Sequence, residues 1–423
     1  MNKPLCYGLN RKTKLKILHL NVSYGRGGGG GTEQCIPNLC SLLEARGHEN
    51  LVIFSNAFSN FPIVPNRKVV QLEGICSGNL PAAKNRVLVA EVLEIAQREK
   101  IEVVHFHQTN NPLLVHTLTN FSPSVYFVHN HILTCPSGQR LYKSSWEACP
   151  LQPGWACLVN PYLKNCGTRR PVKVGQQLQN CFQMRQEARA FTELLVDSEF
   201  MKQTLLQAGF PANRLTVTAS VTELPQLTEQ ELAYPTSDTL PIVLYVGQLT
   251  EVKGVEFLIK AARQVRTPCR FIIVGDGYAL PTAQKLVTKL DLAKRVEFKG
   301  WVLKEELGQY YRQASLLVVP SIYPEPFGLV GAEAMAYARP VIAFRRGGIP
   351  DWLQHGKTGF LVEPANISEL AAQIDQILTN PALGEQMGKA GRAYLEEKFD
   401  PQVHCTTMLT AYKRAIQNFV SFQ

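Results

Sequence analysis

Residues 241–277 read PIVLYVGQLTEVKGVEFLIKAARQVRTPCRFIIVGDG, and this stretch decides the fold class. It contains an apolar run in 241–249, a helical pattern in 254–265 and a second apolar run in 270–277. Runs rich in valine, isoleucine and phenylalanine are typical of strands buried in a sheet, and a helix between two of them is typical of a βαβ unit. The stretch therefore predicts two parallel strands joined by a helix.

The same alternation extends in both directions from this stretch. Toward the C-terminus it continues through 315–321, 328–339 and 340–345, and the first apolar run of the chain is KLKILHLNV at 14–22. Repeated βαβ units form doubly wound sheets, whose ligands bind at the carboxyl ends of the strands. The sequence therefore predicts an α/β protein of two Rossmann-like, doubly wound domains that face each other across a cleft.

A polar, proline-punctuated stretch at 220–240 separates the two series of strands and is interpreted as a linker. It divides the chain into a first domain at 1–219 and a second domain at 241–399. The helical pattern at 400–423 is expected to strap the two domains together. Within the first domain, a loop at 135–166 is rich in glycine, proline and cysteine.

The composition is that of a globular protein rather than of a nucleic-acid-binding protein. The 423 residues carry a formal net charge of +10, but the basic residues are scattered. The surplus of positive charge is interpreted as an attraction to anionic substrates or to an anionic membrane surface, with a merely solubilising charge as the alternative.

No run of about 18 apolar residues occurs, and the N-terminal residues do not resemble an export signal. We therefore expect a cytoplasmic protein. If the positive charge serves to attract an anionic membrane, the protein would also contact the inner face of the membrane peripherally.

A second stretch, SIYPEPFGLVGAEAMAYARP at 321–340, carries the candidate site. Glu325 lies between two prolines, which favour extended backbone, and a helical pattern begins near Phe327 or Gly328. The unpaired N–H groups and the dipole of a helix N-terminus favour anions. Because Glu333 follows within the helix, the layout suits a ligand with a sugar, phosphates and a ribose. The alternative is that both glutamates only complement the helix dipole.

Together with RPVIAFRRGGIPDWLQHGKTGFLV at 339–362, this stretch resembles the donor-site signature of the retaining glycosyltransferases of family 4. The resemblance covers nearly the whole chain. It implies the two-domain GT-B fold, with a nucleotide-sugar donor bound mainly by the second domain and the acceptor mainly by the first. It also implies sugar contact for Glu325, ribose binding for Glu333, and sugar and phosphate binding by the backbone amides of Phe327, Gly328 and Leu329.

Further segments of the second domain fit the same resemblance. In VGQLTEVKG at 246–254, Lys253 matches the family lysine that neutralises the donor diphosphate, whereas Gln248 stands where the family has an arginine. An arginine can bind a phosphate through two hydrogen bonds, and glutamine offers only neutral donors. The resemblance also implies donor contacts in the segments VGDG and KGWV, through Gly275, Gly277 and Val302.

The glycine-rich run at 25–31 admits two interpretations. It fits G-x-G-x-x-G, which is typical of nicotinamide cofactor sites, but the next predicted strand, LVIFSN, is not followed by the acidic residue that such a site needs. The family resemblance instead implies that Gly31 lies beside the donor phosphates. It further implies that His129, at the end of a predicted strand, contacts the reacting sugar and forms the catalytic set with Glu325 and Lys253.

Eleven cysteines occur in the chain, and four of them fall in the loop at 135–166: Cys135, Cys149, Cys157 and Cys166. The loop has little apolar core of its own, so a metal bound by four cysteines is the favoured interpretation, with structural zinc as the ion and unrelated free thiols as the alternative. No Asp-x-Asp sequence occurs, so a divalent-metal clamp on a diphosphate is not expected. No cofactor is expected to be required for catalysis.

The resemblance and the residues together predict a retaining glycosyltransferase. It would move a sugar from a nucleoside diphosphate to a saccharide, a lipid-linked or a small-molecule acceptor. Two alternatives stay open, a nucleotide-sugar epimerase on the same fold and a non-catalytic nucleotide-sugar-binding protein, the second because of Gln248.

Overall fold

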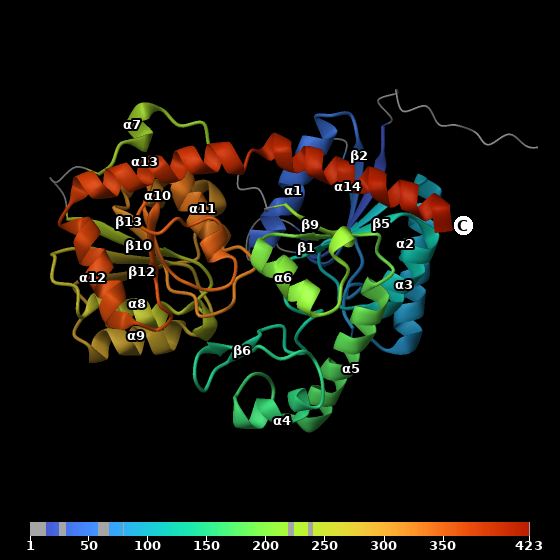
Figure 1. Ribbon diagram of the computed structural model, residues 1–423, viewed down its shortest axis with the longest axis horizontal. Coiled ribbons are helices and arrows are strands. Elements are labelled where there is room, and N and C mark those ends of the chain that lie inside the picture. Colours follow the sequence, from blue (N-terminus) through green and yellow to red (C-terminus); the bar gives the residue numbers. More distant parts are fainter. Residues whose placement is uncertain are drawn as a thin grey trace, which may run out of the picture.

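The computed structural model describes residues 14–24, 31–57, 67–78, 80–218, 224–235 and 240–422. It consists of two lobes, each built on a parallel sheet with helices around it (Figure 1). Apolar side chains fill both faces of each sheet, because the strands are buried nearly throughout. This confirms the predicted α/β fold with two Rossmann-like domains.

The first lobe contains a seven-stranded sheet. Its strands are β1 Lys16–Tyr24, β2 Glu49–Ala57, β3 Lys68–Gln71, β4 Val103–Phe106, β5 Ser124–Val128, β8 Glu193–Val196 and β9 Leu215–Val217. Their order in the sheet is β3-β2-β1-β4-β5-β8-β9. The helices are α1 Gly31–Glu44, α2 Ala82–Glu99, α3 Pro112–Phe121, α5 Pro171–Ala188 and α6 Glu199–Gln207, with the short 3-10 helix η1 Ala212–Arg214.

The second lobe contains a six-stranded sheet. Its strands are β10 Ile242–Val246, β11 Arg270–Val274, β12 Val296–Gly300, β13 Leu316–Val319, β14 Val341–Phe344 and β15 Gly359–Val362, in the order β12-β11-β10-β13-β14-β15. Its helices are η2 Glu251–Lys253, α8 Val255–Ala262, α9 Leu280–Lys289, α10 Lys304–Gln313, α11 Leu329–Ala336, η3 Ile349–Asp351, α12 Ile367–Leu378 and α13 Pro381–Lys398. The short helix α7 Glu229–Leu232 lies in the connection between the lobes.

The strand order of the second sheet positions the candidate site. The strand order reverses at β10: the chain runs from β10 to β11 and β12 on one side and then crosses to β13 on the other side. A ligand site is expected at the carboxyl ends of β10 and β13, where the order reverses. The loop at 247–254 follows β10, and the stretch at 320–328 follows β13. The two segments that the sequence singled out therefore lie side by side.

The last helix, α14 Pro401–Phe422, returns to the first lobe. Figure 1 shows α13 and α14 running in succession over the second and then the first lobe. Cys405, Met408 and Tyr412 of α14 are buried in a core cluster with Ile17 and Val103 of the first sheet. The chain thus crosses between the lobes a second time.

The loop at 135–166 contains β6 Leu141–Tyr142, β7 Glu147–Ala148 and α4 Ala156–Leu163. It belongs to the first lobe in sequence, yet Leu141 is buried in the core of the second lobe. Nζ of Lys143 lies 2.8 Å from a carboxylate oxygen of Glu251, which adds a charged contact between the lobes. Among the described residues, no helix is long and apolar enough to cross a membrane.

Two helical glycines, one in α11 and one in α5, allow a test of how tightly α11 is packed. A Cβ atom at Gly331 in α11 would overlap the ring of the fully buried Trp352, whereas one at Gly175 in α5 would meet nothing within 4 Å. We expect Gly331→Ala to lower the free energy of unfolding by about 1–3 kcal/mol through overpacking. Gly175→Ala should raise it by roughly 0.5–1 kcal/mol, because alanine favours the helix. Urea unfolding of both variants measures the difference, and equal effects would contradict the tight packing of α11.

Candidate functional site

A cavity of about 400 Å³ lies between the two lobes. The second lobe contributes most of its wall, through the segments that follow β10, β11, β12 and β13. The first lobe contributes Gln108, His129, Asn130 and Asp197, which follow β4, β5 and β8. A concave site with a mostly apolar wall and a few polar groups is typical of small-molecule binding.

Most of the residues predicted from the sequence line this cavity: His129, Gln248, Lys253, Gly275, Val302, Glu325, Phe327, Gly328, Leu329 and Glu333. Gly277 is not among the described lining residues. A Cβ atom there would overlap the backbone of Leu249, so this glycine allows two loops to pack closely. Gly31 is the first residue of α1, and the glycine-rich residues before it lie outside the described part of the chain.

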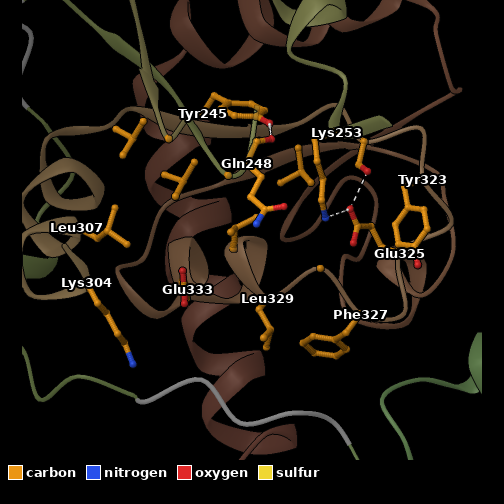
Figure 2. A pocket seen from close by; sticks show the side chains of 18 of the residues that line it. Tyr245, Gln248, Lys253, Lys304, Leu307, Tyr323, Glu325, Phe327, Leu329 and Glu333 are labelled. Atoms are coloured by element: carbon orange, nitrogen blue, oxygen red, sulfur yellow. Dashed lines mark hydrogen bonds and ion pairs between the residues drawn. The ribbon is translucent and has the colours of Figure 1, made fainter. Parts of the chain in front are cut away.

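Glu325 forms the central charged contact of the cavity (Figure 2). Its Oε1 atom accepts hydrogen bonds from Nζ of Lys253 at 2.6 Å and from Oγ of Ser321 at 2.7 Å. The residue is only 6% exposed, so the carboxylate is removed from most of the solvent. The contact joins the loop after β10 to the segment after β13. A charge-assisted pair of this kind holds both groups in a defined orientation.

The ammonium group of Lys253 keeps donors available beyond this pair. A lysine ammonium has three donors, and the Lys253 side chain is 33% exposed. Nζ also lies 5.6 Å from the centre of the Tyr323 ring, a distance compatible with a cation–π contact. A fixed cation at the cavity wall can therefore bind a ligand anion without losing its contact with Glu325.

The N-terminus of α11 also opens onto the cavity, since Gly328, Leu329 and Val330 line it. Gly328 precedes the helix with a φ of +93°, a left-handed backbone conformation that residues other than glycine rarely adopt. Nε1 of the buried Trp352 donates a hydrogen bond to the carbonyl of Phe327 at 2.7 Å. The indole therefore holds the start of α11 in place, and the first N–H groups of a helix have no partner within the helix.

Glu333 lies further along α11, and Figure 2 shows the two carboxylates on opposite sides of Leu329. The hydroxyl of Tyr311 donates to Oε2 of Glu333 at 2.8 Å. Burial, and then the nearby Glu333 charge, raise the pKa of Tyr311 well above its ordinary value, so the hydroxyl stays protonated and can donate. This contact fixes the carboxylate at the cavity wall.

Gln248 occupies the position that the family gives to an arginine. Figure 2 shows its side chain projecting into the same space as Lys253. The hydroxyl of Tyr245 donates to the backbone oxygen of Gln248 at 3.1 Å, which orients the loop. The side chain thus faces the site, as the resemblance implied, but brings an uncharged amide.

Asp197, which was not among the predicted site residues, pairs with His129. Oδ2 of Asp197 lies 3.0 Å from Nδ1 of His129, and the two side chains are 4% and 1% exposed. The carboxylate can accept a hydrogen on Nδ1, and in the tautomer with that hydrogen the lone pair of the ring is on Nε2. In the described part of the chain, this Nε2 atom has no protein partner. A signal was present in the sequence, since Asp197 directly follows the apolar run Leu194–Val196 as His129 follows another.

Three further histidines lie deeper in the first lobe. The side-chain nitrogens of His19, His105 and His107 lie within 4.8 Å of one another, and this is the group of described residues whose spacing could hold a metal ion. Burial lowers the pKa of His19 to about 4, so the ring is neutral. Asn50 lies 2.9 Å from His19 and the Tyr412 hydroxyl 2.7 Å from His105, so protein groups already satisfy two of the nitrogens. They form a buried polar layer behind the His129 pair.

The four cysteines of the loop at 135–166 are free thiols. Burial, and then the other three thiols nearby, raise the pKa of Cys166 to about 11. The four lie close enough to influence one another, but among the described residues they do not form a group within the 4.8 Å that the histidines satisfy. Metal binding at this loop stays a prediction, and it would require the sulfur atoms to move closer together.

Sequence comparison assigns both halves of the chain to glycosyltransferases. Residues 29–219 match the model described as Glycosyltransferase Family 4, and residues 228–394 match the model described as Glycosyl transferases group 1. The alpha-D-kanosaminyltransferase of Streptomyces kanamyceticus is 36% identical over 155 residues, which is 36% of this chain and 40% of that protein. The N-acetyl-alpha-D-glucosaminyl L-malate synthase of Bacillus anthracis is 32% identical over 175 residues, covering 41% of this chain and 45% of that protein. These matches span less than half of each relative.

Solved structures share the fold along nearly the whole chain. The Anabaena protein HepE in complex with UDP and glucose has a TM-score of 0.69 at 21% identity and covers 94% of this chain and 99% of its own. The sucrose-phosphate synthase of Thermosynechococcus elongatus has a TM-score of 0.72 at 22% identity, with 96% and 100% covered. At this identity the likeness concerns the fold. With the two family matches and the donor-site signature lining the cavity, the chain belongs to glycosyltransferase family 4 and has its two-domain GT-B fold.

Proposed function

We propose that the protein is a retaining glycosyltransferase that moves a sugar from a nucleoside diphosphate to an acceptor hydroxyl. One observation carries the proposal: a single cavity contains the Lys253–Glu325 ion pair, the N-terminus of α11 and a second carboxylate, Glu333. A fixed cation and helix N–H groups favour a diphosphate, whereas carboxylates accept hydrogen bonds from sugar and ribose hydroxyls. The cavity volume of about 400 Å³ suits a ligand of this size.

In this proposal, the donor diphosphate binds at the start of α11 within reach of Lys253. As the bond between the sugar and the diphosphate breaks, negative charge grows on the leaving oxygen, and Lys253 and the helix N–H groups stabilise it. The acceptor hydroxyl forms the new glycosidic bond on the same face of the sugar, and its proton passes to the leaving phosphate oxygen. Glu325, oriented by Lys253 and Ser321, holds the sugar hydroxyls during this step.

His129 would contact the transferred sugar from the first lobe. Because Asp197 accepts the hydrogen on Nδ1, the Nε2 atom of the neutral ring can accept a hydrogen bond from a sugar hydroxyl. Asp197 is then a positioning residue, which acts by fixing the tautomer and orientation of His129. No enzyme nucleophile is part of this proposal.

A second, smaller cavity of about 210 Å³ in the first lobe supports a sugar-containing acceptor. Its polar wall consists of uncharged hydroxyls and amides: Ser77, Asn110, Ser137, Gln176, Gln177 and Asn180. Such groups both donate and accept hydrogen bonds, which suits the hydroxyls of a neutral sugar better than a charged substrate. Gly138 of this wall also accepts a hydrogen bond from Tyr323 of the main cavity at 3.3 Å, so the two sites are neighbours.

A screen of nucleoside diphosphate sugars tests the proposed activity. Solved structures of HepE contain UDP and UDP-glucose, so UDP-sugars are the first donors to try. A donor that binds should raise the melting temperature by mass action. Donor consumption that depends on an added saccharide or lipid-linked acceptor supports transfer. Conversion without acceptor would indicate an epimerase, and binding without conversion a non-catalytic protein.

The two glutamates should give different kinetic changes. We expect Glu325→Gln to lower kcat by about a hundredfold with little change in donor KM, because its contact matters most in the transition state. Glu333→Gln should raise donor KM by roughly tenfold, as expected for the loss of one hydrogen bond to a charged group. Steady-state kinetics with varied donor measures both variants, and identical profiles would contradict this division of roles.

The affinity for a nucleoside diphosphate should depend on Lys253 and should change when Gln248 is replaced. Lys253→Ala should weaken nucleoside diphosphate binding about ten- to a hundredfold, the range for a hydrogen bond between charged groups. Gln248→Arg should tighten binding by roughly tenfold, because the added guanidinium can bind phosphate at two points. Isothermal titration with UDP compares both variants with the wild type. If neither affinity changed, the loop after β10 would not hold the phosphates.

Treatment with a chelator tests separately whether the donor site needs a divalent ion and whether the cysteine loop binds structural zinc. We expect EDTA to leave the initial rate of transfer unchanged, since Lys253 and the helix N-terminus supply the positive charge in place of a divalent ion. A slow loss of activity together with a falling melting temperature would instead indicate structural zinc at the four cysteines. Rapid inactivation that magnesium alone reverses would overturn the metal-independent donor site. Elemental analysis of the purified protein provides the independent measurement.

A further inference from the structure

Exposed apolar side chains concentrate on one short element of the first lobe. Sixteen large apolar residues are exposed in the described part of the chain, and six of them fall within 13 residues: Leu151, Trp155, Leu158, Val159, Tyr162 and Leu163. Trp155 is 80% exposed and Leu163 69%. Isolated exposed apolar residues are ordinary, but a cluster of this kind indicates an interaction surface. We call the five from Trp155 to Leu163 the α4 apolar face.

The helix geometry gathers these residues on one side. At 3.6 residues per turn, the side chains of Trp155, Leu158, Val159, Tyr162 and Leu163 fall within an arc of roughly 140°. On the opposite side of α4, Pro161 is buried and Cys157 is half-buried against the protein. A helix normally turns its apolar side to the core. In α4 the apolar side faces outward, although the helix itself is packed against α5.

The surroundings of this face are strongly basic. Between Glu147 and Glu187 the chain carries five basic residues, Lys164, Arg169, Arg170, Lys173 and Arg185, and no acidic residue. The first four are exposed, and within the described part of the chain no carboxylate pairs with them. The net charge of +10 predicted an attraction to anions, and this segment accounts for half of that surplus.

The position of α4 makes the face accessible. Figure 1 shows α4 at the edge of the molecule, on the side away from α13 and α14. The neighbouring helix α5 contributes Gln176, Gln177 and Asn180 to the smaller cavity. A surface that docks through α4 would therefore lie close to the proposed acceptor site.

We propose that the α4 apolar face docks on the surface of a membrane that contains anionic lipids. Tryptophan, tyrosine and leucine on one face partition into the headgroup region, and flanking lysines and arginines attract anionic headgroups. A second copy of the chain is a poorer partner, because a symmetric contact would bring two clusters of the same positive charge together. Docking itself does not depend on the proposed activity. Docking near the smaller cavity would also suggest that the acceptor sugar is attached to a membrane lipid, and this second step does rest on the proposed activity.

Vesicle flotation tests the proposal with the full-length protein. We expect binding to vesicles of phosphatidylcholine with phosphatidylglycerol, and at least about tenfold weaker binding to phosphatidylcholine alone. Trp155→Ser with Leu163→Ser, and separately Arg170→Gln with Lys173→Gln, should each lower the partition coefficient by at least about tenfold. Raising NaCl from 0.1 to 1 M should also weaken binding, since the screening length falls from roughly 10 to 3 Å.

Matched substitutions elsewhere separate the α4 face from general surface effects. Leu240→Ser removes another exposed leucine, and Lys285→Gln with Lys289→Gln removes two exposed cations from α9. These controls should bind vesicles as the wild type does, and the melting temperatures of all variants should agree. UDP affinity without vesicles should be unchanged in the α4 variants, which keeps a failure of docking distinct from a failure of the donor site.

Three results would overturn membrane docking. One is a wild-type protein that does not float with anionic vesicles. Another is equal loss of binding in the α4 variants and the controls. The third is a dimer in sedimentation velocity, without vesicles, that Trp155→Ser with Leu163→Ser converts to a monomer, since the face would then join two copies of the chain.

Discussion

The close approach of the two loops after β10 and β13 is the constraint on which the site depends. Gly254 has a φ of +76°, and a Cβ atom there would overlap the carbonyl oxygen of Pro320. Only glycine permits this contact between backbones. It brings Lys253, directly before the glycine, next to Glu325 on the neighbouring loop, and the ion pair then joins the two. A single backbone contact thus determines where the fixed cation of the cavity lies.

A second contact, made by Trp352, holds the start of α11 in place. Trp352 is fully buried, donates to the carbonyl of Phe327 and packs the six-membered ring of its indole against Gly331. Because the indole occupies the space that a side chain at position 331 would need, the helix cannot shift without losing both the hydrogen bond and the packing. The helix N-terminus and the cation are therefore preorganised independently, which is what stabilisation of developing charge requires.

The contacts between the lobes combine polar and apolar groups. Lys143 pairs with Glu251 in the loop that also carries Lys253, and Tyr323 contacts the backbone of the cysteine-containing loop. Leu141 of the same loop is buried in the core of the second lobe. The cysteine-containing loop of the first lobe thus contacts two segments of the second lobe that adjoin the cavity, the loop after β10 and the segment after β13.

The sequence by itself determined the fold class and most of the cavity wall, because both depend on local patterns. Apolar runs alternating with helical patterns specify parallel strands, and residues after such strands must meet at one edge of a sheet. Glu325, Lys253 and Glu333 were therefore predictable, and so was the neighbourhood of His129. Their proposed roles come from the family resemblance, because a pattern of apolar residues carries no information on function.

Only the tertiary structure decided which side chains pair and which face the solvent. The Lys253–Glu325 and His129–Asp197 contacts join residues 72 and 68 positions apart, and a pattern along the chain carries no information on such distances. Gly277 packs on Leu249 rather than lining the cavity, because backbone proximity and not its motif determines its role. The apolar residues of α4 would be assigned to a core by their spacing, yet Pro161 occupies the inward side and the apolar side faces outward. The direction in which a helix turns its apolar side is set by what it packs against.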